Sequence, residues 1–229
     1  MPTLGDQLCR FYLRLNISAS LPAGIEILQP YNDPEVRKLV KIFFKKFYDD
    51  NRPRRLLIGI NPGRYGAGVT GINFTAPRQL RENCGIVHHF GDSSELSAEF
   101  IYEVIAAYGG PKKFFGDYFI GSVSPLGFVQ EGKNLNYYDN KDLQKALTPF
   151  ISDCLDQLLS FGFDRSRCAC IGGEKNFRFL QGLNEVRKQQ GKNSFSEIIP
   201  LPHPRFIMQY RRKQKQAFIE LYLQALRQA

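Results

Sequence analysis

The chain has 229 residues, a formal net charge of +9 and a hydrophobic content of 43%. This length suits one domain with a full core, so we expect a single domain over residues 1–229. No run approaches the roughly 18 uninterrupted apolar residues of a membrane helix, and residues 1–6 lack the pattern of a signal peptide. These absences argue against a membrane or secreted protein and predict a cytoplasmic one.

Helical periodicity alternates with short apolar runs along the chain. Helices are expected at about 3–16, 34–49, 94–108, 141–161, 174–190 and 209–227, and strands at about 55–60, 117–123, 167–172 and 196–200. Residues 109–116 are expected to form a loop. Enough chain separates successive strands for a crossover helix, so the pattern predicts an α/β protein with three α/β/α layers around a central, mostly parallel four-stranded sheet.

The first expected strand ends in an unusual turn. Residues 56–66 read Leu-Leu-Ile-Gly-Ile-Asn-Pro-Gly-Arg-Tyr-Gly, an apolar run followed by a polar, glycine-rich segment. The run predicts a buried parallel strand that delivers Asn61 to the carboxyl edge of the sheet, where ligands bind in open α/β folds. The spacing fits neither a Walker loop nor a dinucleotide fingerprint.

Two later strand ends also carry polar groups. Ser122 lies at the end of the second expected strand, and His203 follows the last one between two prolines. In a parallel sheet these ends lie on the same edge as Asn61, so an amide, a hydroxyl and an imidazole would surround one pocket.

Positive charge is concentrated in two stretches. Residues 51–81 contain six arginines and no acid, and residues 198–219 contain five basic residues and no acid. This placement favours a polyanion held against these loops, and the alternative is a solvated cluster of charges. A pocket of convergent polar groups beside a basic rim suits a reaction on a nucleotide.

Five cysteines, an odd number, predict reduced thiols. The chain has no Cys-x-x-Cys sequence, so we expect neither a zinc site nor an iron–sulfur cluster, and no other cofactor.

The glycine-rich turn resembles the water-activating motif of the uracil-DNA glycosylase superfamily, above all of its single-strand-selective monofunctional (SMUG) branch. The matching segments are residues 59–66 and 70–74, and the resemblance extends from about residue 54 to residue 208. It implies that Asn61 orients the hydrolytic water and that Phe74 stacks on the extruded base. It also places further residues in base binding: Gly59, Ile60, Gly63 and Tyr65.

The segment 119–126, with residues 132–135 after it, is similar to the family's base-reading strand. Ser122 stands where the family has an asparagine that reads the uracil edge. A fixed amide can donate to uracil O4 and accept from N3–H, whereas a hydroxyl does one at a time and adapts to other bases. Hypoxanthine and xanthine are therefore alternative substrates.

Residues 202–206 resemble the family's His-Pro-Ser loop, with Arg205 in place of the serine. The resemblance gives His203 the catalytic place and residues 206–208, Phe-Ile-Met, that of the wedge that enters the base stack. The departures at Ser122 and Arg205 indicate a divergent bacterial subfamily. The residues expected to contact DNA are Arg64, Arg205, Phe206, Ile207, Met208, Arg211, Arg212 and Lys213, together with Lys215.

The predicted function is that of a metal-independent, monofunctional DNA glycosylase in base excision repair. Its partner would be single- or double-stranded DNA with a damaged base, uracil above all, and the protein would be a monomer at the nucleoid if bacterial. No motif offers a lysine nucleophile, so no lyase step is expected. The alternatives are a hydrolase of small nucleotides or nucleosides and a non-catalytic nucleic-acid-binding module.

Two site residues have structural alternatives. His203 between its prolines also fits a packed loop histidine, and Phe74 also fits a core aromatic. Tyr65 suits either the lining of the pocket or the capping of the turn.

Overall fold

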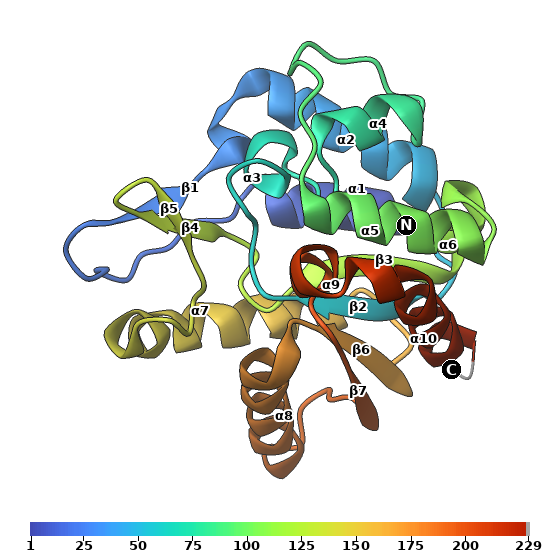
Figure 1. The fold of residues 1–229 in the computed structure, drawn as a ribbon. Coiled ribbons are helices and arrows are strands. Elements are labelled where there is room, and N and C mark those ends of the chain that lie inside the picture. The colour runs from blue at the N-terminus through green and yellow to red at the C-terminus, as the bar shows by residue number, and fades with distance from the viewer. Residues whose placement is uncertain (228–229) are drawn as a thin grey trace.

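The computed structural model describes residues 1–227, and Figure 1 shows their arrangement. The elements run in this order: α1 (Leu4–Tyr12), β1 (Ile25–Leu28), η1 (Pro30–Asn32), α2 (Pro34–Tyr48), β2 (Arg55–Gly59), α3 (Ala67–Thr70), α4 (Pro77–Glu82), α5 (Leu96–Tyr108), α6 (Pro111–Asp117), β3 (Tyr118–Ser122), β4 (Gly127–Gln130), β5 (Lys133–Leu135), α7 (Lys141–Leu159), β6 (Arg167–Ile171), α8 (Gly173–Gln189), β7 (Glu197–Leu201), α9 (Pro204–Tyr210), η2 (Arg212–Gln214) and α10 (Lys215–Arg227).

The central sheet has the strand order β3-β2-β6-β7, and every pairing in it is parallel. Its strands are short and almost fully buried at the centre, as expected for a sheet covered on both faces. Figure 1 shows α2, α5 and α6 on one side of this sheet and α7 and α8 on the other. The predicted three-layer α/β/α fold and its parallel four-stranded sheet are confirmed.

Helix boundaries follow from local capping chemistry. Asp33 caps α2, where its Oδ1 accepts a hydrogen bond from the Glu35 N–H (2.8 Å), and Pro34 occupies the first turn. Asn140 caps α7 in the same way. The apolar faces of the helices meet the sheet in one cluster of buried side chains that extends from Leu4 to Leu226.

A second, antiparallel sheet with the order β1-β4-β5 was not predicted. Its β4–β5 hairpin turns at Glu131 and Gly132, which have φ values of 50° and 69°. Two successive positive φ angles match the right-handed twist of paired strands. In Figure 1 this small sheet stands to the left of the central one. The end of β5 contacts the segment after β2, where the Leu135 carbonyl accepts a hydrogen bond from Asn61.

Two expectations about loops were wrong. Residues 109–116 were expected to be a loop, but α6 begins at Pro111. Gly110, with a φ of 89°, separates this helix from α5. Residues 202–206 were also expected to form a loop, but α9 begins at Pro204 and includes the predicted wedge at 206–208. The expected helix at 209–227 is therefore divided among α9, η2 and α10.

The cysteines are all free thiols, and Cys168 and Cys170 are buried in β6. None of the helices within residues 1–227 combines the length and the hydropathy needed to cross a bilayer. Within the same residues, no three His, Cys, Asp or Glu side chains come together in a way that could hold a metal ion.

Candidate active site

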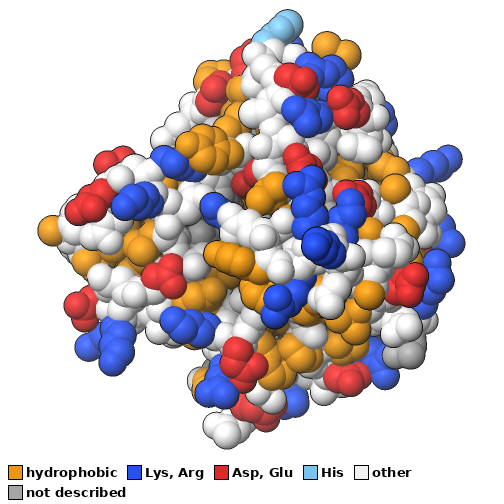
Figure 2. All heavy atoms as spheres, in the orientation of Figure 1, with side chains coloured by type: hydrophobic (Ala, Val, Ile, Leu, Met, Phe, Trp, Pro, Cys, Tyr) orange, Lys and Arg blue, Asp and Glu red, His pale blue; other side chains and the backbone are white. Residues whose placement is uncertain are grey.

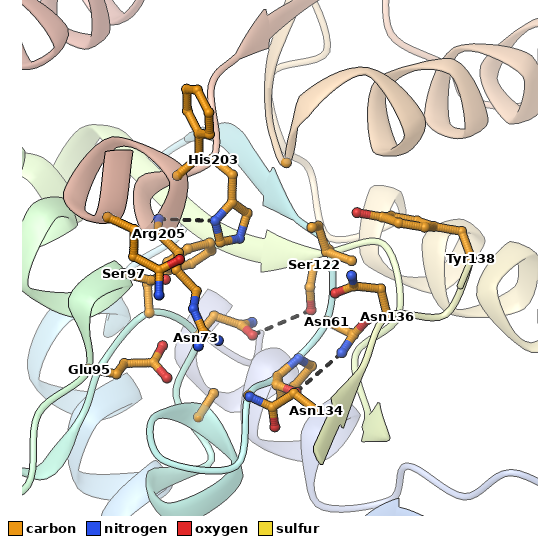
Figure 3. Close-up of a pocket in the computed structure, with 18 of the residues that line it drawn as sticks. Asn61, Asn73, Glu95, Ser97, Ser122, Asn134, Asn136, Tyr138, His203 and Arg205 are labelled. Atoms are coloured by element: carbon orange, nitrogen blue, oxygen red, sulfur yellow. Dashed lines mark hydrogen bonds between the residues drawn. The ribbon is translucent and has the colours of Figure 1, made fainter. Parts of the chain in front are cut away.

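A pocket of about 340 Å³ lies at the carboxyl edge of the central sheet. The carboxyl ends of β2, β3, β6 and β7, or the residues directly after them, supply Asn61, Ser122, Gly172 and His203 to its lining. Figure 3 shows Asn61, Ser122 and His203 around one space, as their strand-end positions predicted. The structure therefore brings the expected amide, hydroxyl and imidazole together.

The side chain of Asn61 is held in one orientation. Its Nδ2 donates to the carbonyl oxygens of Pro62 and Leu135, both at 3.3 Å, and its Oδ1 accepts from the Tyr137 N–H at 3.1 Å. Both amide hydrogens are therefore used, while Oδ1 keeps one lone pair for a ligand. The segment after β5 thus fixes which atom Asn61 offers to the pocket.

His203 is a neutral donor. Its Nδ1 accepts a hydrogen bond from the Arg205 backbone N–H (3.1 Å) and so caps α9. An accepting Nδ1 carries no proton, so the neutral ring has its hydrogen on Nε2. Burial, with a smaller contribution from the charge of Arg205, lowers the pKa of His203 to about 4. The ring therefore stays uncharged at neutral pH.

Phe74 lies in the pocket in a strained conformation. Its φ is 52°, a value that a bulky residue rarely adopts, and its ring centroid is 6.5 Å from that of His203. A Cβ on Gly59 would come within 2.5 Å of the Phe74 ring, so this glycine makes room for the aromatic side chain. Gly59 does not itself line the pocket. Its contribution to base binding is indirect, because it leaves room for the Phe74 ring.

Ser122 acts together with Asn73, a residue that sequence reasoning did not single out. Ser122 Oγ donates to Asn73 Oδ1 at 3.3 Å, and Asn73 Nδ2 donates to the Tyr12 hydroxyl and to the Ile120 carbonyl. The Ile120 carbonyl accepts only, so it fixes the orientation of the Asn73 amide. Ser122 therefore faces the pocket mainly with its lone pairs.

Ile60 and Gly63 line the pocket as expected, but Tyr65 does not. The Tyr65 side chain is 54% exposed, and the Arg64 guanidinium lies over its ring at 4.5 Å. Arg64 also donates to the Gly132 carbonyl of the hairpin turn. The predicted base-binding role of Tyr65 is therefore not supported, because the glycine-rich turn points it outward.

The remaining polar lining was not predicted, although Asn73 and Asn134 lie in the matching segments 70–74 and 132–135. These residues are Asn73, Glu95, Ser97, Asn134, Asn136, Tyr138, Gln209 and Tyr210. Asn134 and Asn136 belong to the unpredicted hairpin and the residues after it. The Glu131-Gly132 pair between two short runs was the available signal for that hairpin.

Of the predicted wedge at residues 206–208, only Phe206 is exposed. Ile207 and Met208 are buried against the core, with exposures of 0% and 4%, because α9 turns them inward. Phe206 is 44% exposed at the rim, and Tyr210, one helical turn later, lies 5.7 Å from it. Ile207 and Met208 thus have a packing role, and the exposed pair is Phe206 with Tyr210.

The two basic stretches differ in what their charges do. Arg54 is buried and binds Asp50, Arg55 pairs with Asp164, and Arg78 and Arg81 both reach Asp92. The arginines of residues 51–81 are therefore mostly neutralised within the protein. A polyanion contact along that whole stretch stays a prediction, and within residues 1–227 Arg64 is the one arginine of the stretch with no carboxylate within 4 Å.

The second basic stretch is more accessible. Arg205, Arg211, Arg212 and Lys213 are exposed, whereas Lys215 is paired with Glu103 at 2.6 Å. The Arg211 guanidinium lies 5.7 Å from the Phe206 ring. Figure 2 shows Lys and Arg side chains gathered over α9 near the centre of this face.

These exposed charges predict that the affinity for DNA falls as the salt concentration rises. Replacing both Arg212 and Lys213 by glutamine should reduce the slope of log affinity for DNA against log salt by about 1.4–1.8, because each lost phosphate contact removes about 0.7–0.9. Affinities measured from 50 to 200 mM salt provide the test. The matched control is Arg178→Gln, which removes an arginine on α8 and should leave the slope unchanged. An unaltered slope in the double variant would rule out this phosphate surface.

Comparisons with known proteins agree with this geometry. The model of the uracil DNA glycosylase superfamily matches residues 45–227. The crystal structure of wild-type SMUG2 from Pedobacter heparinus is similar, with a TM-score of 0.93 and 40% sequence identity over 99% of this chain and 98% of that chain. A comparison with curated protein sequences found no match. The two likenesses include every segment that lines the pocket.

Proposed function

Since the chain belongs to the uracil DNA glycosylase superfamily and is a monofunctional DNA glycosylase of base excision repair, we propose that its pocket receives an extruded uracil and hydrolyses the bond to C1′. The proposal rests on two side chains of the pocket that each keep one hydrogen-bonding atom available for a ligand. Asn61 keeps an acceptor on Oδ1, and His203 keeps a donor on Nε2. Hydrolysis of this bond needs both.

Asn61 would place the attacking water. Breaking an N-glycosidic bond passes through an oxocarbenium-like state, so the water needs correct placement more than a strong base. The Asn61 amide is already locked by Pro62, Leu135 and Tyr137. It therefore needs no rearrangement when the nucleotide enters.

His203 would stabilise the leaving base. Negative charge develops on uracil O2 as the bond breaks, and a donor aimed at that atom acts as an oxyanion hole does. A neutral imidazole with a pKa of about 4 donates without carrying a charge that must be desolvated. The same logic applies to the carbonyl oxygen of other deaminated bases.

The rim would hold the opened duplex. Base extrusion costs a few kcal/mol, which stacking of the base on Phe74 offsets. The exposed Phe206 and Tyr210 would fill the gap left in the stack, beside Arg211, Arg212 and Lys213. We also propose action as a monomer in the cytoplasm, on single- or double-stranded DNA.

Ser122 favours a base range wider than uracil. Its side chain is shorter than an asparagine, and its hydroxyl is engaged with Asn73, so a larger purine edge meets no fixed amide there. Release of free base from oligonucleotides that contain one uracil, hypoxanthine or xanthine tests the proposal. Release of none of the three by the wild-type protein would overturn it.

The variant Ser122→Asn should narrow this range. An asparagine can both donate to O4 and accept from N3–H, so we expect the ratio of uracil release to hypoxanthine release to rise by about 10-fold or more. Single-turnover rates on matched oligonucleotides measure the ratio. The control is Ser124→Asn, at a buried serine two residues away whose hydroxyl binds the Leu126 carbonyl outside the pocket. A ratio that stays constant in Ser122→Asn would show that position 122 does not read the base.

A further inference from the structure

One carboxylate in the pocket has no role in the account above. Glu95 immediately precedes α5, is half-buried and lines the pocket. Across residues 1–227, no hydrogen bond and no ion pair within 4 Å reaches its side chain. In Figure 3 the carboxylate points into the pocket from the side opposite Asn136 and Tyr138.

Two glycines of the turn after β2 make the space that this carboxylate occupies. A Cβ on Gly66 would lie 2.7 Å from Glu95 Cδ, and a Cβ on Gly63 would lie 3.3 Å from Glu95 Oε2. The glycine-rich turn therefore seats Glu95 beside the loop that carries Asn61.

An unpaired carboxylate is costly in a site built for DNA. Burial raises the pKa of Glu95, and the charge of Arg205 opposes that change only in part. The carboxylate also repels phosphates, so a contact with the DNA backbone would be unfavourable. The partner that suits it is a neutral N–H donor brought into the pocket by the substrate.

On the basis of the proposed function, we propose that Glu95 is a specificity-determining residue that accepts a hydrogen bond from the ring N–H of the extruded base. Uracil and hypoxanthine each carry a ring N–H beside a carbonyl, where cytosine and adenine have an unprotonated ring nitrogen. A carboxylate oxygen attracts the first arrangement and repels the second. Glu95 would thus favour uracil over cytosine and hypoxanthine over adenine.

Ser122 does not recognise the ring N–H of the base in this way. Its hydroxyl donates to Asn73, and one hydroxyl cannot replace both functions of an amide. Glu95 supplies an acceptor from another segment, across the pocket from Asn136. A pyrimidine and a purine edge can both present their ring N–H to it, which suits a wide range of deaminated bases.

The test separates contact with the base from contact with the rest of the DNA. Wild type, Glu95→Ala and Glu95→Gln are compared for single-turnover uracil release and for affinity to an oligonucleotide with an abasic site. We expect Glu95→Ala to lower uracil release by about 10–100-fold, and Glu95→Gln, which keeps an acceptor oxygen, to lower it less. Affinity for the abasic site should be unchanged or tighter, because the lost contact is to a base that is absent there.

The matched control is Glu99→Gln, one helical turn later on α5 and outside the pocket lining. It should release uracil at the wild-type rate. Wild-type rates in both Glu95 variants would overturn the inference, and so would an equal loss of uracil release and abasic affinity, which would indicate a structural role. Failure of the wild-type protein to release uracil would instead count against the proposed function.

Discussion

Replacing Asn61 by alanine should lower the single-turnover rate of uracil release by about 10²–10³-fold, with DNA affinity close to that of the wild type. The loss arises because the attacking water is no longer held in line with C1′, and misplacement by about 1 Å already costs roughly 10²-fold. The amide contacts no DNA phosphate in this account, so binding should not weaken. Rapid-quench measurements with enzyme in excess give the rate of the chemical step.

The matched control for this prediction is Asn51→Ala, at an exposed asparagine before β2 and outside the pocket. It should behave as the wild type in both rate and affinity. If Asn61→Ala released uracil within 3-fold of the wild-type rate, Asn61 would not position the water, and the central role of the turn after β2 would be lost.

Replacing His203 by alanine should lower the same rate by about 10²–10³-fold, the usual cost of removing a donor from an oxyanion hole. The variant also loses the cap of α9, which should reduce the free energy of unfolding by about 0.5–2 kcal/mol. His203→Asn separates the two effects, because its side-chain oxygen can still accept from the Arg205 N–H. Only the alanine variant should lose stability, and both should lose activity.

An NMR titration of the His203 ring gives an independent check. Because burial lowers the pKa, the ring should stay neutral with its proton on Nε2 from pH 8 to pH 5 and titrate near a pKa of about 4. His89, which is exposed, is the matched control, and His89→Ala should leave base release unchanged. Activity retained in His203→Asn, or a ring that titrates at its ordinary pKa, would contradict the proposed role.

Much of the fold was predictable because its signals are local and repeated. The four strands of the central sheet are short apolar runs bounded by turn residues, and the long helices have clear caps such as Asp33 and Asn140. Since parallel strands end at one edge, their order along the chain was enough to bring Asn61, Ser122 and His203 together. That inference needed no knowledge of side-chain contacts.

The parts that were missed depend on distant contacts. Nothing near Asn73 in the sequence shows that its amide meets Ser122 and Tyr12, and nothing near Glu95 shows that two glycines make room for it. The arginines of residues 51–81 looked like a DNA surface because their acidic partners, among them Asp164, come from elsewhere in the chain. Charge counts along a sequence do not reveal such pairing.

The segment after His203 shows a different reason for error. Its apolar residues suit a wedge in a loop, but Pro204 starts a helix, and the helical period turns Ile207 and Met208 towards the core. Phe206 and Tyr210 remain outside because they lie one turn apart on the opposite face. The distinction between wedge and core could be made only once the segment was known to be helical.

The most direct test of the account is the stoichiometry of base release. The wild-type protein is incubated, in EDTA, with an oligonucleotide that contains one uracil, and free uracil, alkali-labile sites and intact strands are quantified together. We expect one free uracil for each alkali-labile site, in a strand that stays uncut until alkali is added. Strand cleavage before alkali, or labile sites without free base, would contradict hydrolysis of the glycosidic bond in this pocket.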